Sequence, residues 1–321
     1  VMKASKTYLI ITTYSFVALA IYNSCAALFR AMNESKVTMW VSLLMNVINV
    51  VGNAICIYGL HMGVAGVAIP TTISRYVAAV VIFLLMFQTK KEINLCGQIT
   101  WKFNGSLIKK ILYIAIPNGL ENSMFQLGKI LVMSAVATMG TSAIAANAVT
   151  GTIANWNNLP GFAINLAIVS VVSVCVGAGR YDQARYYTRR LCRDAMIGIS
   201  CLSIILYLSA PILVTFFNLG PDAAQLTIQI VRIHAVASAF LWMPAFGVPN
   251  TLRAAGDVVW PMSVAIFSMV FRVVLAYVFT YVCHFGLVSI WVAMFIDWVV
   301  REIFYVLRYK GHKWEHFAQK S

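Results

Sequence analysis

Long apolar runs, separated by short polar segments, occupy almost the whole chain. Nine of these runs are long enough to cross a bilayer as a helix, which takes about 20 residues. Their approximate bounds are 7–30, 37–60, 64–88, 109–138, 143–178, 195–218, 224–252, 261–283 and 287–308. The fifth run is too long for one straight crossing and contains Pro160, so we expect a bent or interrupted helix there. The pattern predicts an all-α polytopic membrane protein.

Two segments, about 25–87 and 248–309, align without a gap when the first is shifted by 223 positions. In both, an apolar helix leads through a short basic loop, a second helix and a tight turn to a third helix. The matched positions include Arg30 with Arg253, Glu34 with Asp257, Met39 with Met262, Tyr58 with Tyr281, His61 with His284, and Gly63 with Gly286. A tandem repeat of apolar helix bundles is typical of transporters whose substrate path lies between two halves.

The repeat also predicts how the chain is divided into a partial first half and a complete second half. The expected parts are the last three helices of the first half at 1–92, a cytoplasmic linker at 93–106, six helices of the second half at 107–310 and a cytoplasmic tail at 311–321. By the same offset, the first half would begin before Val1. We therefore expect a fragment that holds nine spans of twelve and lacks about three helices.

The composition excludes an ordinary soluble protein. The 321 residues are 61% hydrophobic and only 11% charged, with a mean hydropathy of +0.81, whereas a soluble domain has about 25% charged residues. The formal net charge of +14 would suit a nucleic-acid partner. The basic residues are spread over alternate loops and form no single patch, so we expect no nucleic acid.

Lysine and arginine gather in alternate connections between the apolar runs. One set of connections and the C-terminal tail carry Arg30, Lys36, Lys90, Lys91, Lys102, Arg180, Arg185, Arg189, Arg190, Arg193, Arg253, Arg308, Lys310, Lys313 and Lys320. Because basic residues set membrane orientation, this pattern predicts a multi-pass protein of the plasma (inner) membrane with a cytoplasmic C-terminus. The segment 180–193 indicates a short amphipathic cytoplasmic helix, whose arginines would contact membrane lipids.

No sequence pattern points to catalysis. The seven cysteines form no CxxC motif, and the five histidines do not cluster. Walker A and nucleophile–base motifs are absent from the sequence. We expect a protein that is not an enzyme and needs no cofactor apart from a coupling ion.

Two acidic residues, Glu121 and Asp297, lie about ten residues from the cytoplasmic ends of their helices. A rise of ~1.5 Å per residue places each roughly 15 Å deep, near the middle of the bilayer. A carboxylate there is costly unless it is paired, protonated or in contact with water, so each is a candidate functional residue. Such a group can bind and release a proton or another cation.

Glu121 and Asn122 follow Asn118 by three and four residues, so the three side chains fall on one face of the helix. Pro117 would loosen the helix just before Glu121 and free backbone carbonyls. The predicted coupling site, for Na⁺ or a proton, consists of Glu121, Asn118, Asn122 and Gln126. The alternative is a structural ion pair between Glu121 and a nearby cation, such as Lys129 or Arg232.

Asp297 precedes Arg301 by one helical turn, which favours an ion pair within one helix. Such a pair would remove most of the cost of burying the acid, and it could still act as a gate by breaking between two states. Lys129, two turns after Glu121, could be a counter-charge that gates proton uptake. Asp297, Arg301 and Lys129 are therefore candidate gating or structural charges.

Amides and aromatic residues indicate a cavity for substrate. Asparagine on a lipid-embedded helix either joins helices or lines a wet cavity, and the fifth run carries several. Aromatic surfaces suit flat organic cations through stacking and cation–π contact, although core packing is the alternative for each one. The candidate cavity residues are Asn155, Trp156, Asn157, Asn158, Phe125 and Trp242.

Four stretches, in this order, resemble the MATE (multidrug and toxic compound extrusion) family, within a larger group that includes lipid-linked sugar flippases. They are 28–34 with its twin 252–257, 63–68, 116–117 with 176–179, and 296–298 with Arg301. The resemblance covers about residues 10–314, in the place of helices four to twelve of a twelve-helix family. It implies two lobes that alternate between outward- and inward-open states, with Glu121 in the place of an acid that some members use for cation coupling.

We therefore predict a MATE-like two-lobe bundle that works as a monomeric secondary antiporter. It would export small organic cations or drugs in exchange for Na⁺ or H⁺. One alternative is a flippase for a lipid-linked or other amphiphilic substrate, which would need a cationic cavity supplied by Lys129, Arg232 and Arg272. The other alternative is a non-transporting remnant.

Overall fold

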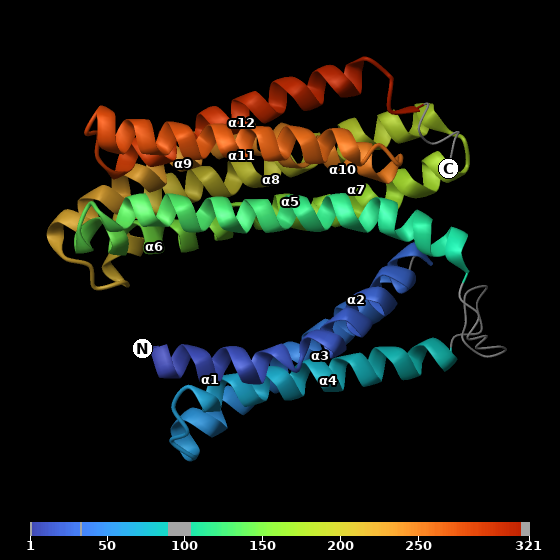
Figure 1. Cartoon of the computed structure of the whole chain (residues 1–321), viewed down its shortest axis with the longest axis horizontal. Helices are drawn as coiled ribbons and strands as arrows, with labels where there is room; N and C mark the ends of the chain where they lie inside the picture. The colour runs from blue at the N-terminus through green and yellow to red at the C-terminus, as the bar shows by residue number, and fades with distance from the viewer. Residues whose placement is uncertain (1, 33, 89–103, 316–321) are drawn as a thin grey trace. The chain divides into compact units, whose positions relative to one another are not determined.

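The computed structural model describes residues 2–32, 34–88 and 104–315, and divides the chain into two compact units, 1–103 and 104–321. All secondary structure in the described residues is helical (Figure 1), which confirms the predicted all-α class. The predicted linker lies outside the described residues except for 104–106. The predicted tail is described only as far as Glu315.

The first unit is a bundle in which α4 packs against α1, α2 and α3. Its helices are α1 (Met2–Thr13), α2 (Phe16–Ala31), α3 (Ser35–Ala54), the π-helix η1 (Ile55–Gly59) and α4 (Ala65–Gln88). Buried Phe29, Ile82 and Met86 form part of its apolar core. Amides join two of the helices, because Asn49 of α3 donates to the hydroxyl of Thr71 on α4 over 3.0 Å.

The first predicted span is bent in the structure, since α1 and α2 meet at 49°. Two side chains of α4 satisfy polar groups at the break: Arg75 donates to the hydroxyl of Ser15 over 2.7 Å, and Tyr76 donates to the carbonyl of Tyr14 over 2.9 Å. The span predicted at 7–30 thus corresponds to two helices that meet at a bend, which the sequence analysis did not predict. A broken membrane helix persists where neighbouring helices satisfy the freed groups, as α4 does.

The second unit contains the larger apolar core. Its helices are α5 (Gly105–Ala137), α6 (Thr141–Asn157), α7 (Leu159–Gly177), α8 (Tyr181–Thr215), α9 (Pro221–Phe246), α10 (Val248–Ala254), α11 (Val259–Tyr277), the π-helix η2 (Val278–Val282) and α12 (Leu287–Lys310). Helix α9 packs against α6, α8 and α12, and α5 packs along α11 (Figure 1). Within this unit, α9 therefore connects α6, α8 and α12, while α5 is held by α11.

The break in the fifth predicted span is confirmed. Helix α6 ends at Asn157 and α7 begins at Leu159, with Pro160 in the first turn of α7. Proline lacks a backbone N–H, so it suits the first turn of a helix and interrupts a longer one. The break lets the two halves of the run take different directions beside α9.

The segment 180–193 is not a separate helix, so this part of the prediction is wrong. It forms the beginning of α8, which continues without interruption to Thr215. Between Arg193 and Ala195 the sequence has neither glycine nor proline, and nothing ends the helix there. The arginines therefore stand on the polar first half of a helix whose second half is apolar.

The last described turn of the chain packs against the beginning of α8. Arg185 donates to the carboxylate of Glu315 over 3.1 Å, and Trp314 stacks on Tyr309 at 5.8 Å between ring centroids. Arg185 also forms an ion pair with Asp182, one turn earlier on α8. The two basic segments thus lie at the same end of the second unit.

The internal repeat is confirmed by backbone geometry. The π-helices at Ile55–Gly59 and Val278–Val282 are separated by the predicted offset of 223 residues. His61 and His284, which follow them, share a left-handed φ of 52°. Both copies therefore contain the same widened turn followed by the same sharp reversal.

Six helical segments of the described residues are long and apolar enough to cross a membrane, or seven if α1 and α2 count as one bent span. The other two predicted spans correspond to α5 and α12, of 33 and 24 residues. Both are long enough to cross a bilayer. These two helices carry Glu121 and Asp297. Of the predicted spans, the two that are less apolar are therefore those with the candidate charged residues.

A glycine permits the closest approach of α7 to α9. A Cβ atom at Gly161 would overlap the indole ring of Trp242, which is only 3% exposed. We expect Gly161→Ala to destabilise the protein by about 1–3 kcal/mol, the usual cost of overpacking a core. Thermal unfolding in detergent would measure this loss. Gly119→Ala is the matched control, because a Cβ there meets no atom within 4 Å; equal unfolding temperatures for the two variants would contradict the expected overlap.

Candidate functional site

A cavity of about 540 Å³ lies within the second unit, between α5, α6, α7, α9, α11 and α12. Its lining combines aromatic side chains with four charged ones. The charged residues in the lining are Glu121, Lys129, Arg272 and Arg301. A cavity of this size, with an apolar wall and a few polar groups, is typical of a small-molecule site.

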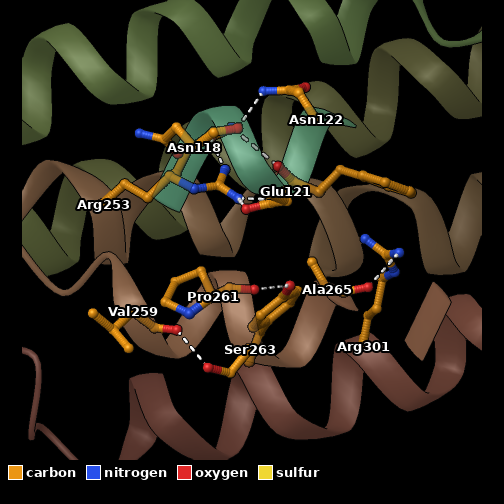
Figure 2. Close-up of polar contacts among 12 residues, drawn as sticks. Asn118, Glu121, Asn122, Arg253, Val259, Pro261, Ser263, Ala265 and Arg301 are labelled. Carbon is orange, nitrogen blue, oxygen red and sulfur yellow. Dashed lines mark hydrogen bonds and ion pairs between the residues drawn. The ribbon is translucent and has the colours of Figure 1, made fainter. Parts of the chain in front are cut away.

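Glu121 is held by Arg253, which is the charge at the end of α10. The guanidinium of Arg253 donates to both carboxylate oxygens of Glu121, each over 2.6 Å (Figure 2). Asn250, one turn earlier, accepts a further hydrogen bond from Arg253 over 2.9 Å. Each side chain of the pair is 19% exposed. The pair therefore joins α5 to α10 at the edge of the cavity and is still within reach of water.

The other predicted coupling residues are distributed unevenly around Glu121. Asn122 lines the cavity, whereas Asn118 and Gln126 do not. The amide of Asn122 donates to the carbonyl of Asn118 over 2.8 Å (Figure 2), and the amide of Asn118 donates to the carbonyl of Ile114 over 3.0 Å. Their side-chain nitrogens are thus engaged with their own helix. Only Glu121 and Asn122 of the predicted set share the cavity.

Asp297 and Arg301 form the expected pair within α12, at 3.1 Å between the carboxylate and Nε. Both are buried: Asp297 is 0% exposed and Arg301 is 3% exposed. Arg301 also donates to the carbonyl of Ala265 on α11 over 3.4 Å (Figure 2). The second carboxylate oxygen of Asp297 has no hydrogen-bond partner among the described residues. The pair therefore ties α12 to α11 while leaving one acceptor unsatisfied.

Lys129 and Arg272 are the two remaining cations of the cavity wall. Lys129 contacts the ring of Phe125 at 4.8 Å from its centroid, and no carboxylate pairs with it within the described part of the chain. The Nε atom of Arg272 is buried, and no hydrogen-bond partner is found for it there either. Lys129 and Arg272 thus carry like charges in the wall of one cavity. Lys129 is therefore not the partner of Glu121, contrary to one sequence alternative.

The aromatic part of the wall is continuous. Trp242 packs edge-on against Phe162 at 5.1 Å, and its ring is tilted by 30° against that of Phe246 at 5.3 Å between centroids. His234 lies within 6.1 Å of the rings of Trp291, Phe295 and Trp298 and is 3% exposed. Trp291 is fixed by donating to the amide oxygen of Asn147 over 3.1 Å. These contacts give the cavity an apolar face, and Arg301 lies against it over the ring of Phe246 at 5.6 Å from the centroid.

The structure separates the six predicted substrate residues into two groups. Asn155, Asn158, Phe125 and Trp242 line the cavity. Trp156 is 47% exposed and lies outside the lining. Asn157 is fully buried and exchanges hydrogen bonds with Ser203 and Ser238, so it joins α6 to α8 and α9.

Sequence reasoning missed Arg253, because it placed this residue in a loop. The repeat offered a signal, since Arg253 aligns with Arg30 at the corresponding helix end. Arg272 was named only for the flippase alternative and His234 was not predicted to belong to the site, and both line the cavity. Arg232, the other suggested partner of Glu121, instead lies over the ring of Tyr207 at 5.3 Å. Only the tertiary packing of α9 and α11 distinguishes these residues from ordinary membrane-helix cations.

The pair of Asp297 and Arg301 makes a prediction about stability. Arg301→Met should destabilise the protein strongly, because it leaves a fully buried carboxylate without its counter-charge; the typical cost is about 3–5 kcal/mol. Asp297→Asn combined with Arg301→Met should recover most of the loss, since no charge then remains unpaired. Thermal unfolding of the two variants in detergent measures the difference. A double variant as unstable as the single one would show that packing, and not charge, explains the loss.

Comparison with known proteins gives concordant matches. The sequence model of the MatE family matches residues 117–278, half of the chain. The chain is 27% identical over 303 residues to the uncharacterized transporter YisQ of Bacillus subtilis, covering 92% of this chain and 66% of that protein. It is 24% identical over 320 residues to the probable multidrug resistance protein NorM of Thermotoga maritima, covering 98% and 68%. The chain thus spans about two thirds of the length of these curated relatives.

Solved structures of similar fold cover nearly the whole chain. A crystal structure of MATE in the straight conformation superposes with a TM-score of 0.87 at 19% identity, covering 98% of this chain and 70% of that one. A transporter of the MOP superfamily from Pyrococcus furiosus, described as having a binding pocket of reverse polarity, gives a TM-score of 0.87 at 18% identity, with the same coverage. At such identities the likeness concerns the fold.

Proposed function

The chain belongs to the MatE family of multi-pass membrane transporters, and we propose that it serves in exporting drug-like molecules in exchange for Na⁺ or H⁺. The cavity of the second unit would hold the transported molecule. Transport would follow alternating access, in which ligands shift the balance between two states. The observation that carries this proposal is the pairing of Glu121 with Arg253 at the edge of that cavity.

This pair gives a physical route from ion binding to helix movement. A proton or Na⁺ that binds the carboxylate of Glu121 competes directly with the guanidinium of Arg253. Loss of the pair releases a bidentate contact that joins α5 to α10. An ion that favours the broken pair therefore favours the state in which these helices separate, which is the differential binding that coupling requires.

The transported molecule is proposed from the cavity wall. An aromatic surface that includes Trp242, Trp291 and Phe125 suits flat drug-like molecules by stacking, and the sequence-based proposal is a small organic cation. A second candidate is an amphiphile that carries an anion. The presence of Lys129 and Arg272 in the same wall favours that candidate, because both cations lack a paired carboxylate within the described residues.

We also propose how the chain is arranged in the membrane. We infer a monomer in the plasma (inner) membrane, in which residues 107–310 form one lobe and residues 1–92 contribute three helices to the other. The beginning of α8 and the last described turn would both face the cytoplasm, because both are basic and they contact each other. Arginines on the polar part of α8, such as Arg189 and Arg193, would meet anionic lipid headgroups.

Replacement of Glu121 tests the coupling scheme. Glu121→Gln keeps the shape of the side chain and removes its charge, so efflux driven by a cation gradient should be lost while membrane insertion is kept. The measurement is efflux of a fluorescent organic cation from vesicles that contain the native protein, under separate Na⁺ and H⁺ gradients. The gradient that drives efflux in the unaltered protein identifies the coupling ion.

Glu302→Gln is the matched control, since Glu302 lies on α12 outside the cavity lining. It should leave gradient-driven efflux unchanged. Normal efflux by the Glu121→Gln variant, in vesicles where the control is also active, would remove Glu121 from the mechanism.

A further inference from the structure

We propose that Lys129 of α5 and Arg272 of α11 form a subsite that binds the anionic group of a substrate molecule. The group would be a carboxylate, phosphate or sulfonate attached to an apolar body. This inference rests on the proposed function, because it assigns the chemical class of the molecule that enters the cavity.

The first support is the balance of charge around the cavity. Six charged side chains line it or pair with a residue that does. They are Glu121, Arg253, Asp297, Arg301, Lys129 and Arg272. Four of the six form two ion pairs and neutralise one another. Lys129 and Arg272 remain, so the described cavity has an excess of two positive charges.

The second support is the lack of partners for these two cations. Lys129 contacts a phenyl ring, which compensates an ammonium only weakly compared with a carboxylate. Asp297 also acts on Arg272 through its charge. The carboxylate of Asp297, however, forms its ion pair with Arg301 and not with Arg272. The buried Nε atom of Arg272 finds no hydrogen-bond acceptor in the described residues. A planar guanidinium with unused donors is therefore available beside an unpaired ammonium.

Burial makes this arrangement costly without a ligand or water. A charge inside a membrane helix requires a counter-charge, a water-filled cavity or a backbone acceptor. Two like charges in the wall of one cavity increase the cost further. An anion between Lys129 and Arg272 would remove the repulsion and satisfy the donors of both. Guanidinium and ammonium groups are the usual protein ligands of carboxylates and phosphates.

The rest of the cavity indicates what the anion would be attached to. Besides these cations, the lining contains an aromatic face formed by Trp242, Trp291 and Trp298. Lys129 lies eight residues beyond Glu121, roughly 12 Å along α5 at ~1.5 Å per residue. The coupling pair and the proposed anion subsite thus occupy different parts of the cavity. The molecule that fits is an amphiphile with one anionic end and a planar or aromatic body.

Two probes with the same body and opposite charge test the inference directly. The probes are 2-naphthoate and 2-naphthylmethylammonium, titrated into the native protein in phosphatidylcholine nanodiscs, with quenching of tryptophan fluorescence as the readout. Naphthoate should bind more tightly than the ammonium compound. Lys129→Gln and Arg272→Gln should each weaken naphthoate binding about tenfold or more, the usual effect of losing a charged hydrogen bond. Tighter binding of the ammonium compound would overturn the inference.

Further variants separate a specific subsite from general charge or misfolding. Arg232→Gln is the matched control, because it also removes a membrane-helix cation but lies over Tyr207 outside the lining; naphthoate binding should persist. Lys129→Arg should retain binding, and Lys129→Glu should reverse the preference towards the ammonium probe. If Lys129→Glu folds, as judged by thermal unfolding, and still prefers naphthoate, the subsite is not there.

A comparison of nanodiscs with different lipids identifies the source of the anion. Nanodiscs that contain phosphatidylglycerol should weaken naphthoate binding if a lipid headgroup occupies the subsite, and should leave it unchanged if the ligand is a soluble organic anion. Either result supports an anion subsite. These binding measurements do not depend on an ion gradient. Preference for the ammonium probe together with gradient-driven efflux would refute this inference alone, whereas naphthoate binding without such efflux would refute only the proposed function.

Discussion

A charged side chain inside a bilayer must find a counter-charge, water or a backbone acceptor, and this requirement organises the second unit. Arg253 meets Glu121 and thereby joins α10 to α5. Arg301 meets Asp297 and reaches the backbone of α11. The helices that carry these charges therefore meet at the cavity or at its edge.

Local sequence signals were sufficient for most of the fold. Hydrophobic run lengths located the helices, Pro160 located the break between α6 and α7, and the offset of 223 residues matched the two copies down to their turns. The resemblance to the MATE family is confirmed by the family match and by the fold. These features depend on neighbouring residues or on periodicity, which one sequence contains.

The site was predicted less completely because its contacts join residues far apart in the chain. The pair of Asp297 and Arg301 spans one helical turn and was visible in the sequence. The partner of Glu121 lies 132 residues away and was not. Asparagine has the same appearance in a sequence whether it lines a cavity, as Asn155 does, or joins three helices, as Asn157 does. Only packing distinguishes these roles.

The paired π-helices have a consequence for the register of the two copies. A π-helix closes its hydrogen bonds over five residues and so accommodates one more residue than an α-helical turn. Leu60 donates to Ile55 and Cys283 donates to Val278 in this manner, and the two bonds are 223 positions apart. Because the extra residue stands at the same place in both copies, a single offset relates the residues before it and the residues after it.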